Sequence, residues 1–145
     1  MFKKKTFLII IIIFLKSIST SYSTEDFFNN AKKEYDSKNY NKSKFLFQRN
    51  IIFNPKDSKS YLYLAKIYNN EKNQQKELKN LNTALLLEPN NEEATYMMIN
   101  IQLKKSNYEK VKKLKNNFLL ICSTLCNKEV SINERLKNIE PKNES

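Results

Sequence analysis

Residues 58–91 read SKSYLYLAKIYNNEKNQQKELKNLNTALLLEPNN, and this stretch decides the fold. The apolar residues of its first half recur at the spacing of one helix face, and they are Tyr61, Leu64, Ala65 and Tyr68. Those of the second half form a facing stripe, which consists of Leu81, Ala84 and Leu85. Pro89 then ends the second helix, because proline cannot continue one. The stretch therefore predicts two helices joined by a turn.

The same unit recurs along the chain, and its period equals the length of residues 58–91. Pro55 and Pro89 lie one period apart, and Tyr40 and Tyr108 lie two periods apart. The period divides the chain into repeats at 24–57, 58–91 and 92–125. The third repeat keeps the apolar pattern but has Ser123 where a proline would stand, as expected of a terminal repeat.

A helical unit of this length resembles the tetratricopeptide repeat. The resemblance implies an all-α fold, a right-handed superhelical stack whose first helices line a concave groove. Residues 126–145 are expected to add a capping helix and a short tail, with an apolar face made of Val130, Ile132, Leu136 and Ile139. The family's glycines are absent, and Asn39 and Asn107 are expected to supply the left-handed turn conformation instead.

The composition excludes most catalytic machinery. The 145 residues include no His, so neither a Ser–His–Asp triad nor imidazole ligation of zinc is available. They include no Gly, which excludes the phosphate-binding loops that depend on it. We therefore expect no enzyme, no cofactor and no metal site. The net charge of +11 is accompanied by abundant Asn, Lys and Ile, the residues that AT-rich codons encode.

The amino terminus has the three zones of a secretory signal peptide. Lys3, Lys4 and Lys5 precede an apolar run, Phe7–Leu15, and a polar segment ends in Ser21-Tyr22-Ser23. Residues 1–23 are expected to be a cleaved signal that sends the chain to the periplasm of an AT-rich bacterium. An uncleaved membrane anchor is the alternative. In a eukaryotic secretory protein, Asn41-Lys42-Ser43 would be a glycosylation acceptor.

The resemblance implies a scaffold or adaptor that binds a segment of another protein of the cell envelope in the concave groove. Counting along the first helices, the expected groove residues are Phe28, Lys32, Tyr35, Lys66, Asn69, Tyr96 and Asn100. Some family members grip a peptide carboxylate with five polar side chains. Four of those positions are occupied here by Phe28, Tyr63, Glu93 and Met97, so that activity is not expected. The bland alternative is that groove side chains only pack against neighbouring helices.

The densest run of charge lies in the third repeat and supports a second interpretation. It consists of Lys104, Lys105, Lys110, Lys112, Lys113 and Lys115. It is either a solvated outer face or a surface for an anionic partner, such as a membrane or an acidic protein. The chain would then be a structural or membrane-associated envelope protein. No nucleic-acid-binding motif is present, so nucleic acid is not an expected partner.

Cys122 and Cys126 are the only thiols. Two thiols without His cannot complete a zinc site, which leaves a disulfide or two buried free thiols as open alternatives.

Overall fold

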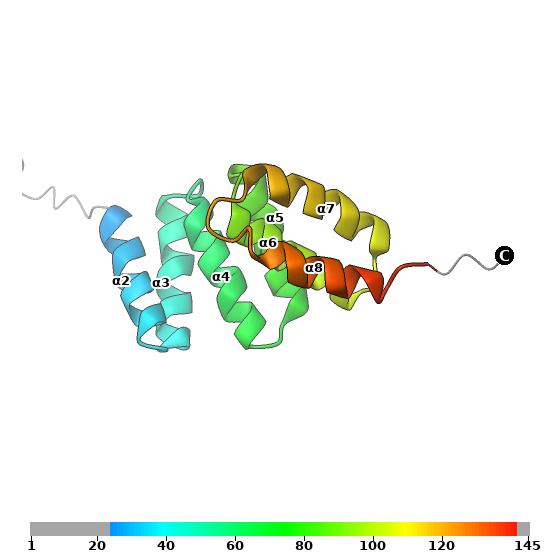
Figure 1. The fold of residues 1–145 in the computed structure, drawn as a ribbon. Helices are drawn as coiled ribbons and strands as arrows, with labels where there is room; N and C mark the ends of the chain where they lie inside the picture. Colours follow the sequence, from blue (N-terminus) through cyan, green and yellow to red (C-terminus); the bar gives the residue numbers. More distant parts are fainter. Residues whose placement is uncertain (1–23, 142–145) are drawn as a thin grey trace, which may run out of the picture.

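The computed structural model describes residues 24–141, and in this part of the chain it has seven α-helices and no strand (Figure 1). The first helices of the repeats are α2 (Thr24–Asp36), α4 (Ser58–Asn70) and α6 (Glu92–Lys104). The second helices are α3 (Tyr40–Phe53), α5 (Gln74–Leu87) and α7 (Tyr108–Ile121). Each start and each end shifts by one full period between repeats. The all-α helical repeat fold is therefore confirmed, and it is tetratricopeptide-like. The predicted signal, residues 1–23, lies outside the described part.

The turn inside each repeat uses a left-handed residue that is not glycine. Lys38, Lys72 and Ser106 have φ angles of 62°, 56° and 51°, and they again lie one period apart. The prediction that Asn39 and Asn107 are left-handed is wrong by one position, because their φ angles are −79° and −88°. These asparagines precede the second helices as N-caps. There an amide oxygen can bind a free backbone N–H, as Asn107 does with Lys110 at 3.4 Å.

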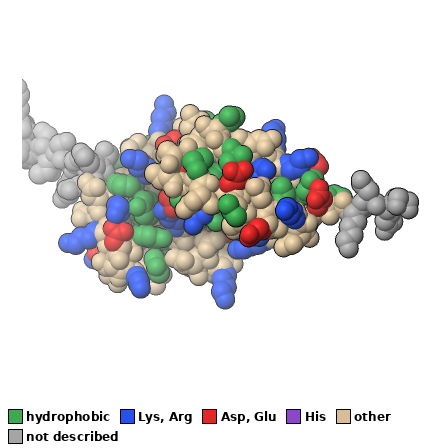
Figure 2. Space-filling model, in the orientation of Figure 1, with side chains coloured by type: hydrophobic (Ala, Val, Ile, Leu, Met, Phe, Trp, Pro, Cys, Tyr) green, Lys and Arg blue, Asp and Glu red, His purple; other side chains and the backbone are tan. Residues whose placement is uncertain are grey.

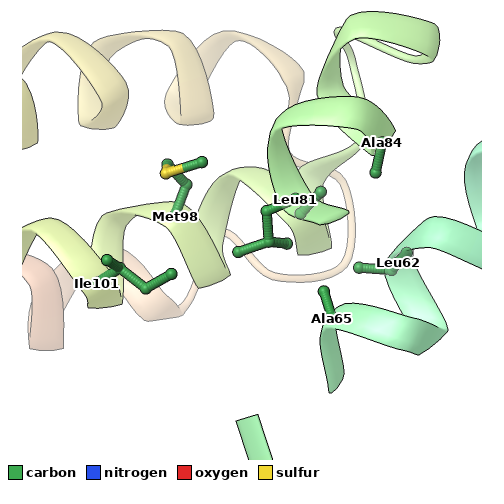
Figure 3. Close-up of a cluster of buried hydrophobic side chains, with 7 residues drawn as sticks. Leu62, Ala65, Leu81, Ala84, Met98 and Ile101 are labelled. Carbon is green, nitrogen blue, oxygen red and sulfur yellow. The ribbon is translucent and has the colours of Figure 1, made fainter. Parts of the chain in front are cut away.

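Three buried clusters each join a repeat to the helix that follows it. The first joins α2 and α3 to α4, and its members are Ala31, Phe47, Leu64, Ile67 and Tyr68. The second joins α4 and α5 to α6 (Figure 3), and its members are Leu62, Ala65, Leu81, Ala84, Ala94, Met98 and Ile101. Because each cluster draws on the next repeat, stacking completes a core that no single repeat contains.

The third cluster depends on a capping helix, α8 (Lys128–Lys137). Ile132 and Leu136 pack there against residues of α6 and α7, in the place of a fourth repeat. The prediction that Val130 shares this apolar face is wrong, since this residue is 65% exposed. Val130 lies two positions before Ile132, which is about 200° around a helix of 3.6 residues per turn, so its side chain points to solvent. None of the described helices is long and apolar enough to cross a membrane.

Candidate functional groove

Two adjoining hollows run along the face formed by the first helices. The first hollow has a volume of about 510 Å³, and Phe28 and Lys32 from α2 and Tyr63 from α4 contribute to its walls. The second hollow, of about 300 Å³, lies between α4 and α6 and is lined by Asn69, Tyr96, Met97 and Asn100, among others. Glu93 lines both hollows and so marks where they meet. We call the two hollows together the groove.

An ion pair lies at this junction. The ammonium of Lys66 is 2.6 Å from the carboxylate of Glu93, and it also lies 4.6 Å from the centre of the Tyr63 ring. Its side chain is only 19% exposed, so the charge of Lys66 is directed into these two contacts. Lys66, an expected groove residue, thus connects α4 to α6 through Glu93.

Tyr35 lines neither hollow. Its ring packs edge-on against Tyr40 at 5.5 Å and against Tyr63 at 5.0 Å between ring centres. Burial raises the pKa of the Tyr35 hydroxyl and that of Tyr63 above the ordinary value. Both side chains therefore stay neutral. Tyr35 packs against Tyr63, which lines the first hollow.

The polar groove residues are held by neighbours within the protein. Lys32 pairs with Asp36 at 2.5 Å on the same helix, and this bond raises the pKa of the lysine. The amide of Asn69 donates to Glu77 at 2.6 Å, which tilts it toward the start of α5. Asn100 accepts a hydrogen bond from Arg135 of α8. The capping helix thus positions one of the amides that line the second hollow.

The loop between α7 and α8, residues 122–127, forms a lip on the groove. Ser123 lines the first hollow and Leu125 lines the second. Of the two alternatives for the thiols, the structure has the disulfide, which joins Cys122 to Cys126 with their Cα atoms 5.3 Å apart. The bond closes the base of the lip.

Glu92, the first residue of α6, anchors the lip from the other side. Its carboxylate accepts backbone N–H groups of Ser123 at 2.7 Å, Thr124 at 3.1 Å and Leu125 at 3.2 Å. The hydroxyl of Thr124 donates to the same carboxylate. Hydrogen bonds from this hydroxyl and these amides lower the pKa of Glu92 to about 2. The carboxylate is therefore ionised and holds the lip through these hydrogen bonds. The sequence analysis did not predict this role of Glu92.

Sequence reasoning also missed Tyr63, Glu93 and Met97 as groove residues. The signal was available, since the resemblance to the tetratricopeptide repeat assigns these positions to a carboxylate grip, and the structure places them in the hollows. Their apolar and acidic side chains suggested that the activity was missing, not that the surface was used differently. Among the described residues, no group of His, Cys, Asp and Glu could hold a metal ion.

The lysine run of the third repeat is not one uniform outer surface. Lys113 is exposed, and Lys112 lies over the Tyr108 ring at 5.2 Å from its centre. Lys115, predicted to point outward with them, instead donates to Asn133 of α8 at 2.9 Å. Its long side chain reaches across to the capping helix because α7 and α8 pack together. Lys104 lines the second hollow.

No known protein-family model and no curated protein sequence matches the chain. Solved structures do share its fold. The type III secretion translocator chaperone SycD of Yersinia enterocolitica is similar with a TM-score of 0.69 at 13% identity, over 88% of this chain and 90% of that one. SycD in complex with a peptide of the translocator YopD gives 0.68 at 13% identity, over 83% and 94%. The CopN–Scc3 complex gives 0.63 at 17% identity, over 84% and 72%. The chain is thus similar in fold to the chaperone SycD, which has also been solved with a peptide bound.

Proposed function

We propose that this chain is a protein-binding adaptor that holds an extended segment of a partner protein in its groove. The observation that carries the proposal is the pair of hollows, about 510 and 300 Å³, that adjoin at Glu93 along the first helices. Each is large enough for side chains of a bound segment. The likeness in fold to SycD, which has been solved with a peptide of YopD, supports the same use of the fold.

The walls suggest what kind of segment would fit. Phe28 and Tyr63 in the first hollow and Tyr96 and Met97 in the second offer apolar surface for two or more side chains. Amide side chains such as Asn100 can bond the polar backbone of a chain lying between them. A segment with apolar side chains spaced along an extended or helical backbone satisfies both features.

The proposal makes the chain a binding protein and not an enzyme. The lack of His and Gly supports this, as does the likeness to chaperones. It also includes export to the cell envelope, for which the support is the sequence Lys3–Lys5 followed by Phe7–Leu15. Sequencing the amino terminus of the native protein tests this part, with a start near Thr24 expected. A soluble cytosolic protein that starts at Met1 would contradict it.

Site-specific photocrosslinking in the native cell tests the binding. A crosslinking amino acid replaces Lys32 in the first hollow or Asn69 in the second, and Asn82 on the exposed side of α5 serves as the outer position. We expect one partner to be captured from both groove positions and not from Asn82. Capture from Asn82 alone would refute the groove as the site.

A matched pair of tyrosine variants then separates binding from packing. Tyr96→Ala removes an aromatic wall of the second hollow, and an anchoring aromatic is commonly worth ~2 kcal/mol, about a thirtyfold loss of affinity. Tyr108→Ala removes another ring that is partly buried against the same cluster as Tyr96 and lines neither hollow. Partner capture from Asn69 should fall with Tyr96→Ala only. An equal fall in both variants would mean that the loss is one of stability.

A further inference from the structure

Three exposed aliphatic side chains occupy the same position in all three repeats. Ile52, Leu86 and Leu120 lie in the last turns of α3, α5 and α7, one period apart from each other. Their side chains are 75%, 81% and 86% exposed. Single exposed apolar residues are common and need no explanation. Recurrence at one repeat position, in a chain that varies at most others, is not random scatter. We call these three side chains the apolar edge.

The layer that carries the apolar edge is strongly basic. Helices α3, α5 and α7 together contain nine Lys and Arg against two Glu. Of those two, Glu77 is buried and accepts a hydrogen bond from Asn69. The first helices α2, α4 and α6 instead contain five Lys against six Asp and Glu. The positive charge of the described residues is thus concentrated in the second helices.

Basic side chains lie on the same helix faces as the apolar edge. Arg49 precedes Ile52 by three residues, one turn along α3. Lys79 and Lys113 precede Leu86 and Leu120 by seven residues, two turns along α5 and α7, and all three cations are exposed. Figure 2 shows Lys, Arg and hydrophobic side chains projecting along the upper edge of the molecule.

The first carboxylates that follow α3 and α5 are directed into the protein. Asp57 accepts hydrogen bonds from Asn50 and Ser60, and Glu88 accepts them from Ser58 and Asn91. These bonds hold the pKa of Glu88 below its ordinary value. An anion that approaches the edge therefore meets exposed cations, while Asp57 and Glu88 are held by partners within the protein.

The chain also enters the fold at this edge. Because the helices of a repeat are antiparallel, the end where α3, α5 and α7 finish is the end where α2 begins, as Figure 1 shows. Residues 1–23, with the apolar run Phe7–Leu15 and its lysines, are therefore connected to the molecule next to the apolar edge.

We infer that the apolar edge docks on the surface of an anionic lipid bilayer. Ile52, Leu86 and Leu120 would enter the boundary between headgroups and acyl chains, while Arg49, Lys79 and Lys113 contact lipid phosphates. Aliphatic tips among cations suit a lipid interface. Protein interfaces depend instead on Trp, Tyr and Arg seated in pockets. Docking through the second helices leaves the groove on the first helices open, so the inference does not depend on the proposed partner.

Tryptophan fluorescence of the full chain tests the docking, because the natural sequence contains no Trp. Leu86→Trp places one fluorophore on the apolar edge, and Asn70→Trp places a matched one at the exposed far end of α4. The probe is vesicles of phosphatidylcholine with phosphatidylglycerol, carrying brominated acyl chains. We expect the Leu86→Trp emission to shift to the blue and to be quenched, and the Asn70→Trp emission to stay unchanged. Added salt should reverse the effect.

A charge variant and the lipid composition complete the test. Arg49→Gln/Lys79→Gln/Lys113→Gln in the Leu86→Trp background should abolish the shift, as should vesicles of phosphatidylcholine alone. Unfolding followed by circular dichroism verifies that each variant is folded. Emission unchanged by anionic vesicles, or equal quenching of Asn70→Trp, would overturn the inference. A blue shift of the Leu86→Trp emission without vesicles would also overturn it. If that shift grows with protein concentration, the edge binds a second copy of the chain. If it does not, the edge is covered by the chain's own residues 1–23.

Discussion

Ala65→Leu tests the close crossing of α4 with its neighbours. Ala65 is fully buried, and it shares its cluster with two further fully buried alanines, Ala84 of α5 and Ala94 of α6. Figure 3 shows Ala65 and Ala84 on facing helices, with Leu62 and Leu81 around them. Small residues at all three positions let the backbones approach, and a leucine would have to push two helices away at once. The substitution therefore disturbs both the second repeat and its contact with the third.

The magnitude follows from the lack of free space. Overpacking of a dense core costs ~1–3 kcal/mol, and the upper half of that range applies where three helices constrain one site. For a domain of this size, each kcal/mol lowers the thermal midpoint by about 4 °C. We expect Ala65→Leu to lower the midpoint by roughly 8–12 °C, measured by circular dichroism. Urea unfolding should give a lower midpoint concentration with an unchanged slope.

Asn82→Leu is the matched control, because Asn82 lies exposed on α5 and can accept the same side chain without displacing a helix. Its effect should stay within ~0.5 kcal/mol. Equal, small effects of the two substitutions would refute the tight crossing, and with it the assignment of Ala65 to the position where the helices of the repeat approach most closely.

Three further predictions concern the contacts around the groove. Glu92→Gln should speed amide hydrogen exchange of Ser123 at neutral pH. Because the fold lowers the pKa of the Glu92 carboxyl from 4.5 to about 2, the difference in exchange rate between the two proteins should disappear as the pH falls from 4.5 toward 2. Exchange that is equally slow in both proteins at neutral pH would contradict the anchor. Reduction of the Cys122–Cys126 bond, which closes a very short loop, should lower the free energy of unfolding by about 2 kcal/mol or less in urea titrations with and without reductant. A double-mutant cycle of Lys66→Met and Glu93→Gln should give a coupling below ~1 kcal/mol, since Glu93 is partly solvated.

The helical repeat fold could be predicted because it depends on local signals. Pro55 and Pro89 mark the period, and apolar residues at helical spacing mark each face. The placement of Ile132 and Leu136 in the core follows the same rule. The predicted position of the left-handed residue in the turn was wrong by one, because Lys38 and Ser106 adopt this conformation although their residue types do not favour it. In those turns the asparagine that follows is used to start the next helix.

The contacts of the groove could be predicted only in part. Lys32, Asn69 and Tyr96 were chosen by counting along helices, and they line the hollows because the direction of a side chain follows from its position. The pairing of Lys66 with Glu93 depends on the distance between α4 and α6, which no local pattern encodes. The packing of Tyr35 against Tyr63 of the next repeat could not be predicted for the same reason.

In the second and third repeats, the first residue of the first helix forms a hydrogen bond to the loop after the second helix, but donor and acceptor are exchanged. In the second, the hydroxyl of Ser58, the first residue of α4, donates to the carboxylate of Glu88 beyond the end of α5 at 2.7 Å. In the third, Glu92, the first residue of α6, accepts the backbone N–H of Ser123 beyond the end of α7 at 2.7 Å. A proline at this position, such as Pro89 in the second repeat, has no N–H to donate. The missing proline thus has a structural consequence, because the N–H of Ser123 adds one hydrogen bond to those that Thr124 and Leu125 donate to Glu92.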